Sequence, residues 1–440
     1  MEAGDTGEGE GEWPTGSHSS SSRSAAQRAS TQRSRILLRV RKEFALQALQ
    51  FLPLLQSKIL RAVDFDHAYD QLKELKRQRA AGGSSSGSGS GSGADKAGGS
   101  PSSSGSGSAL DSNQLWEQIK DSSFTYLFVT AYASSVMCVL MRVQLHVQAR
   151  MLVGAATGTD NHSNGMDSGA GADLFDRVDT ETLKTLVNRT YSSLYGEGLQ
   201  GLTKFVRAQV TAELVDWAVC DTSILVQYQQ LAHKMSNIRK ACETNFPSLL
   251  SSMSLVPEAE RETPEQVSES QSLKQKHTMN ALGSTASAAG ATASSEAIVN
   301  NLLAQTWDVV DSPLFATVCT EAIDTCFRHI SSQLRDKIFL PLDSQGMELT
   351  GSSQPRTPPI ASLLPQLKSI AKEMLPGLPT NGSSSSGGGG SAQGPGSGAL
   401  LTPEVRDIAA GAALDSLCVA IFDAPTSSSS SPPASATSAA

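Results

Sequence analysis

The pattern of apolar and polar positions along this chain predicts long α-helices. Apolar residues recur three and four positions apart, which is the spacing of one helix face, and no alternating strand pattern is evident. The clearest case is 183–218, whose apolar side comprises Leu183, Leu186, Val187, Leu194, Leu202, Phe205, Val206, Val210, Leu214 and Trp217. A further helix is expected to begin at Asp221 or Thr222, which are good N-cap residue types, and to continue through Cys242.

The most apolar stretch, SSFTYLFVTAYASSVMCVLMRVQL (122–145), lies in the middle of the longest predicted helix, which runs from about Leu115 to Met151. No charged residue occurs from Ser122 to Met141, and a helix of that length is ~30 Å long, the thickness of a bilayer core. A helix that is apolar all round is either surrounded by other helices or spans a membrane. The pattern alone leaves both alternatives open.

Gly- and Ser-rich segments interrupt the helical pattern and lack the apolar residues that would repay the entropy of ordering. Disordered insertions are therefore expected at about 80–109, 154–173, 257–293, 342–357 and 379–399. We predict a single helical domain over 35–424, flanked by disordered segments 1–34 and 425–440. The predicted fold class is all-α, an elongated bundle of long helices around a central apolar helix. Within the domain, a helix boundary is expected at Ser312-Pro313, because proline disfavours the helical conformation of the residue before it.

Motifs and composition do not point to an enzyme. The six cysteines form no CxxC pair, and the seven histidines have no metal-ligand spacing such as HExxH. The sequence GEGLQG at 196–201 matches GxGxxG, but a dinucleotide site needs a preceding strand, whereas a helical pattern flanks this motif. A glycine-rich turn or helix break is expected there instead. We predict no catalytic activity, cofactor, metal, nucleic acid or small-molecule substrate.

Two features of the sequence suggest contacts with partners. The net charge is −8, yet segment 35–79 carries ten Lys and Arg against five Asp and Glu. Such a basic helix could face an anionic membrane, bind an acidic partner or form a solvated surface. Trp116 directly follows the start of the long apolar helix and is either a half-buried core residue or an anchor for a partner helix.

The central helix resembles the signature helix of the peroxin three family. The resemblance covers 115–147, LWEQIKDSSFTYLFVTAYASSVMCVLMRVQLHV, with His146 where the family commonly has Asn. Weaker similarities follow in the family's order, at FLPLLQSKI (51–59), YGEGLQGLTKFV (195–206), LLAQTWDVVDSPLFATV (302–318), PPIASLLPQL (358–367) and TPEVRDIAAGAALDSL (402–417).

The resemblance implies a docking receptor at the peroxisomal membrane whose helical domain faces the cytosol. Its apolar groove is expected to bind the amphipathic N-terminal helix of peroxin nineteen, the import receptor that delivers peroxisomal membrane proteins for insertion. The positions that match the family's groove residues are Trp116, Leu72, Lys73 and Ile360. Two lysines of the family's groove rim align instead with Ser112 and Ser362.

The resemblance also leaves the membrane attachment of this chain open. Family members begin with a short membrane anchor, whereas residues 1–34 contain no apolar run of even ten residues. We therefore expect either an incomplete or alternative gene product, or peripheral contact with the membrane through the basic helix 35–61. Alternative functions are an integral membrane protein anchored by helix 122–141 and a helical organelle-tethering scaffold.

Overall fold

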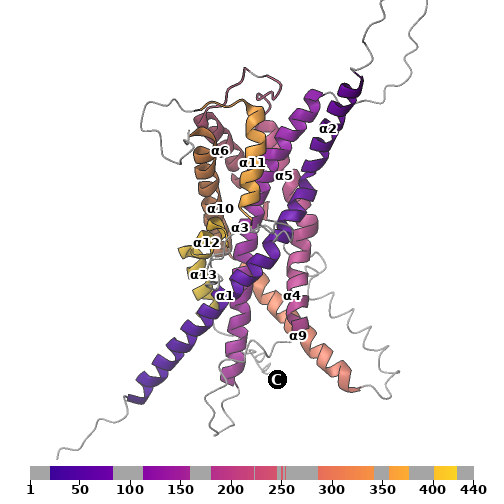
Figure 1. The fold of residues 1–440 in the computed structure, drawn as a ribbon. Coiled ribbons are helices and arrows are strands. Elements are labelled where there is room, and N and C mark those ends of the chain that lie inside the picture. Colours follow the sequence, from indigo (N-terminus) through magenta and orange to yellow (C-terminus); the bar gives the residue numbers. More distant parts are fainter. Residues whose placement is uncertain are drawn as a thin grey trace, which may run out of the picture.

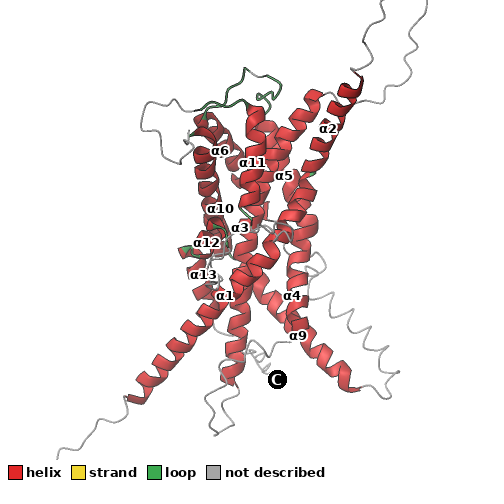
Figure 2. Cartoon of the chain, viewed as in Figure 1, coloured by secondary structure: helices red, strands yellow, loops and turns green. Residues whose placement is uncertain are grey.

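The computed structural model describes most of the predicted helical domain. The described residues are 20–82, 112–158, 180–221, 223–244, 249–250, 253, 286–340, 356–375 and 401–423. Within them the regular secondary structure is helical, and the only extended pairing is an isolated bridge between Leu225 and Pro359 (Figure 2). The predicted all-α fold class is confirmed.

The helix α3 (Ser112–Gly158) forms the centre of the bundle (Figure 1). The helices that pack against it are α1 (Ser20–Val63), α2 (Phe65–Gly82), α5 (Leu199–Glu213), α9 (Ala286–Val310), α10 (Pro313–Leu334), α11 (Ile360–Glu373), α12 (Pro403–Ala409) and α13 (Ala412–Asp423). Every side chain from Ser122 to Ala149 is consequently buried.

The apolar stretch of α3 is covered by protein. Among the described residues, Ser112–Met151 is the one helical stretch that is long and apolar enough to cross a membrane, and its most apolar window is fully buried by the surrounding helices. A helix that is apolar all round is expected at such a position. Of the two alternatives that the sequence left open, packing inside the bundle therefore accounts for this apolar stretch.

The helices α1 and α2 cross the bundle from the lower left to the upper right of Figure 1 and are separated by Asp64, whose φ is 54°. Because α1 begins at Ser20, the expectation of disorder throughout 1–34 is wrong for Ser20–Ser34, a stretch rich in the helix formers Ala, Arg and Gln. The helices α2, α3 and α9 also extend into the edges of predicted insertions. Most of those insertions, and the predicted tail 425–440, lie outside the described residues.

The glycine-rich motif GEGLQG lies at a kink between two helices. The helix α4 (Thr180–Ser193) continues through a π-helical turn, η3 (Leu194–Gly198), into α5, and Gly196 has non-helical angles of φ −97° and ψ −109°. At Gly198, an added Cβ atom would lie 1.8 Å from the carbonyl oxygen of Met253, so no side chain fits there. The predicted helix break is confirmed.

The helix α6 (Tyr228–Thr244) begins later than predicted. The Asp221 carboxylate accepts hydrogen bonds from the backbone N and the Oγ of Ser223, at 2.9 and 2.5 Å, and so forms a local turn instead of capping a helix. Further on, the backbone N of Val226 donates to the carbonyl oxygen of Pro358 at 3.0 Å. The predicted start at Asp221 or Thr222 is therefore wrong, because this segment bonds to a distant part of the chain.

The predicted boundary at Ser312-Pro313 is confirmed. The helix α9 ends at Val310 and α10 begins at Pro313. The Ser312 hydroxyl accepts a hydrogen bond from the backbone N of Phe315 at 3.2 Å, which is the N-cap arrangement. The chain then continues from α10 into the π-helical turn η5 (Arg335–Phe339).

A buried arginine links three helices. Arg142 of α3 is 2% exposed, and its Nη2 lies 2.9 Å from Oδ1 of Asp415 on α13. The other oxygen of Asp415 lies 3.1 Å from Nη2 of Arg41 on α1. One turn beyond Arg142, the buried ring of His146 places its Nδ1 2.8 Å from the Arg142 carbonyl oxygen. A single carboxylate thus joins α1 and α3 to α13.

Candidate partner-binding groove

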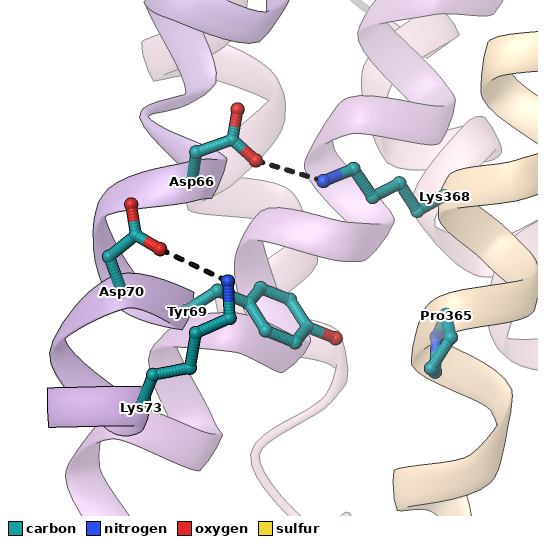
Figure 3. A pocket seen from close by; sticks show the side chains of 6 residues that line it. All are labelled: Asp66, Tyr69, Asp70, Lys73, Pro365 and Lys368. Atoms are coloured by element: carbon teal, nitrogen blue, oxygen red, sulfur yellow. Dashed lines mark hydrogen bonds and ion pairs between the residues drawn. The ribbon is translucent and has the colours of Figure 1, made fainter. Parts of the chain in front are cut away.

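The helices α2 and α11 both pack along α3 and leave an open hollow between them, which we call the α2–α11 groove (Figure 3). Its volume is about 540 Å³. The residues that line it are Asp66, Tyr69, Asp70 and Lys73 from α2, and Pro365 and Lys368 from α11. Since α3 supports both walls, the spacing of the groove depends on how α2 and α11 sit on this central helix.

Two ion pairs set the charge along the groove (Figure 3). Lys368 Nζ lies 2.9 Å from Asp66 Oδ1, which joins the two walls at the end nearest α1. Lys73 Nζ lies 3.2 Å from Asp70 Oδ1, within the α2 wall and beside Tyr69. The Lys73–Asp70 pair is exposed, so it contributes little to stability and leaves Lys73 available to a partner.

The ring of Tyr69 gives the groove an apolar component, and the buried ring of Phe65 lies 5.0 Å from it. Lys368 Nζ lies 4.1 Å from the ring centre of Phe65 and 5.7 Å from that of Tyr69, a cation–π arrangement. Burial raises the pKa of the Tyr69 phenol above its ordinary value of 10.0, so the hydroxyl stays protonated and can donate a hydrogen bond at neutral pH.

Trp116 lies in the early part of α3 beside the far end of α2. Its ring is half-buried, and Lys76 Nζ lies 5.8 Å from the ring centre. Lys76 follows Lys73 by three residues on α2, which places the two ammonium groups on neighbouring turns of one face. The structure therefore brings the predicted tryptophan together with the predicted Lys73 face of α2.

The other two predicted contact residues are less accessible. Leu72 of α2 and Ile360, the first residue of α11, are both buried in the hydrophobic core. Neither is among the residues that line the groove. Of the four predicted residues, Trp116 and Lys73 are therefore the ones whose side chains reach the surface.

The positions that replace two expected rim lysines lie at helix starts. Ser112 is the first residue of α3, and Ser362 is an exposed residue in the first turn of α11, where its Oγ donates to the carbonyl oxygen of Pro359 at 2.8 Å. The positive charge of this region therefore comes mainly from α2 and from Lys368.

Sequence reasoning missed part of the groove. Tyr69 and Lys76 lie four residues before and three residues after Lys73, so helical periodicity could have placed them on the same face. Pro365 and Lys368 gave no such signal, because Lys368 pairs with a residue 302 positions away in the sequence.

The groove is open and is lined by charged side chains, a tyrosine and a proline. Among the described residues, no group of three His, Cys, Asp or Glu side chains could hold a metal ion.

An all-α scaffold with an open groove beside a half-buried tryptophan belongs to the class of helical protein-binding modules. The family model described as Peroxin-3 matches residues 42–422, and the chain belongs to that family. A comparison with curated proteins gives no match. Membership indicates a role in peroxisomal membrane biogenesis, association with the peroxisomal membrane and protein partners.

Proposed function

We propose that the α2–α11 groove and Trp116 bind the amphipathic N-terminal helix of peroxin nineteen, with the helical domain facing the cytosol. One observation carries the proposal: the large ring of Trp116 is only half-buried, packed against the edge of the core. Tryptophan is enriched among residues that dominate binding energy, and an amphipathic helix lays its apolar face into a groove of this kind. By this proposal, the protein is a docking receptor for peroxin nineteen loaded with membrane-protein cargo.

Trp116→Ala is expected to weaken binding of a peptide containing that helix by about 30-fold, because truncating such an anchor costs about 2 kcal/mol. Isothermal titration calorimetry measures the affinity, and circular dichroism verifies that the variant is folded. Leu314→Ala is the matched control, since Leu314 is also a partly exposed apolar residue near a helix start, that of α10. Equal affinities for wild type and Trp116→Ala, or wild-type binding weaker than about 100 μM, would contradict the proposal.

A second candidate function is peripheral membrane contact through α1. Five exposed residues of this helix, Arg35, Leu38, Arg39, Lys42 and Leu46, lie within an arc of about 100° when successive residues turn by about 100°. The two leucines are 57% and 54% exposed. Apolar residues interleaved with basic ones on one helix face suit the surface of an anionic bilayer.

The double variant Leu38→Gln/Leu46→Gln is expected to bind anionic vesicles about tenfold more weakly, because burial of apolar area provides part of the binding energy. Co-sedimentation with vesicles that contain phosphatidylserine measures the partition. Leu54→Gln is the control, since Leu54 is also exposed on α1 but lies outside the arc. Unchanged partition of the double variant would exclude this face as the membrane contact.

A further inference from the structure

The connection between α5 and α6 (residues 214–227) is fastened to the start of α3 by a buried lysine. Lys120 is 3% exposed, and its Nζ donates hydrogen bonds to the carbonyl oxygens of Leu214 and Trp217, at 2.9 and 2.8 Å. Leu214 is the C-cap residue of α5, where backbone carbonyl oxygens lack helical partners and carry partial negative charge. The ammonium group therefore satisfies the carbonyl oxygen of Trp217 and gives a second donor to that of Leu214, which also accepts from the backbone N of Trp217 at 3.1 Å.

Glu117, three residues before Lys120 on α3, also holds this connection. One of its carboxylate oxygens pairs with Lys120 Nζ, and the other accepts a hydrogen bond from the backbone N of Val219 at 2.8 Å. Glu117 directly follows Trp116 in the sequence. The bonds that hold the connection thus originate from the turn that presents the proposed anchor residue.

The other end of the connection is joined to the start of α11. Leu225 forms an antiparallel bridge with Pro359, and the backbone N of Val226 donates to the carbonyl oxygen of Pro358 at 3.0 Å. Pro359 is the N-cap residue of α11 and immediately precedes Ile360. In Figure 2 this connection is part of the green loop near the upper ends of α6 and α11. It therefore bridges the first turns of the two helices that carry Trp116 and Ile360.

We propose that Lys120 is a positioning residue, which fastens the α5–α6 connection so that Trp116 and the first turn of α11 keep a fixed separation. The mechanical part of this inference stands on the contacts above, and its effect on affinity rests on the proposed function. A neutral side chain at position 120 leaves the carbonyl oxygen of Trp217 without a donor and removes one of the two donors to Leu214, so the connection is released from α3. The first turn of α11, which also packs on α3, then loses the second attachment that fixes its position relative to Trp116.

The separation can be measured without any ligand. Nitroxide labels on Gln118→Cys of α3 and Ser362→Cys of α11, both exposed positions, report the distance by pulsed electron resonance. The exposed Cys220 is replaced by Ser in all variants, whereas the other five cysteines are buried. We expect a narrow distance distribution for the parent protein and one at least twice as broad for Lys120→Met.

Two variants separate positioning from general loss of stability. Glu117→Ala removes the acceptor for Val219 from a partly exposed position and is expected to broaden the distribution as well, while Glu117→Gln retains an acceptor oxygen and is expected to restore it. Arg142→Met is the matched control, because it also removes a buried cation from α3 but lies 22 residues along, about 33 Å away. Its distribution is expected to match that of the parent.

Peptide titration then connects the separation to binding. Lys120→Met and Glu117→Ala are each expected to weaken binding of the peroxin nineteen helix by about tenfold, with Arg142→Met unchanged. Folded Lys120→Met and Glu117→Ala variants with the parent's narrow distribution would overturn the positioning role; if Lys120→Met does not fold, Glu117→Ala alone decides. Absence of binding by the parent protein would overturn the proposed function and the predicted effect on affinity, while the distance measurement would still decide whether Lys120 fixes the separation.

Discussion

Asp415→Ala is expected to lower the free energy of unfolding by about 3 kcal/mol, because it leaves the guanidinium of Arg142 buried without its carboxylate. Arg142 is 2% exposed and its Nη2 lies 2.9 Å from Asp415 Oδ1. Arg41, the second cation on the same carboxylate, is largely exposed and can be solvated after the substitution. The cost of the substitution therefore comes from the one cation that water does not reach.

The opposite substitution, Arg142→Met, is expected to cost less than about 1.5 kcal/mol. It removes the buried charge, its Nε atom that has no hydrogen-bond partner, and the cost of desolvating both, while Asp415 keeps its contact with Arg41. Urea denaturation at pH 7, followed by circular dichroism, measures both variants. If Asp415→Ala and Arg142→Met lower the free energy of unfolding equally, the ion pair itself determines stability, and not the unpaired buried charge of Arg142.

Apolar periodicity predicted the central helix but not its exact ends. The pattern predicted a helix from about Leu115 to Met151, and α3 contains that whole range, but its ends at Ser112 and Gly158 lie in polar and small residues. Such residues carry no periodic signal. Only the structure shows that other helices bury α3, because those helices come from all parts of the chain.

Distant contacts explain what the sequence could not predict elsewhere. Asp221 is a good N-cap type, yet its carboxylate is engaged by Ser223 in a turn, and the following segment pairs with Pro358 and Pro359. Likewise, Lys120 reads as an ordinary charged residue at the edge of an apolar run, although its ammonium group binds carbonyl oxygens almost a hundred residues away. Bonds of this kind depend on tertiary packing, which propensity does not encode.

The sequence predicted residues of the α2 wall of the groove but did not indicate the lining residues of the α11 wall. The face of α2 with Lys73 follows from helical spacing, and Trp116 is noticeable as a large aromatic near the start of a long apolar helix. Leu72 and Ile360 were assigned by resemblance, and their burial shows that their side chains do not reach the surface. Accessibility, which decides whether a residue can touch a partner, was the property that the sequence did not contain.

His146→Asn is expected to reduce the loss of stability that acid causes between pH 6.5 and about 4. The pKa of the His146 imidazole is lowered from 6.5 to about 4, chiefly by burial and also by the Arg142 and Arg41 charges, which together outweigh the hydrogen bond to the Arg142 carbonyl oxygen and the Asp415 carboxylate. In this interval the unfolded chain binds a proton at His146 and the folded protein does not, so falling pH favours unfolding. Integrated over the interval, the difference in pKa corresponds to about 3 kcal/mol.

Denaturant titrations at several pH values between 7 and 4 measure this dependence. Asn can retain a donor toward the Arg142 carbonyl oxygen but has no proton to gain in this range, so the free energy of unfolding should decline less steeply with acid than in the wild type. His233→Asn, which removes an exposed imidazole from α6, is the control for the loss of a histidine. Parallel profiles for wild type and His146→Asn would mean that the buried ring takes up its proton equally well in the folded and unfolded states. The position of His146 beside the Arg142–Asp415 pair argues against that, because a protonated ring there would place a third positive charge against a single carboxylate.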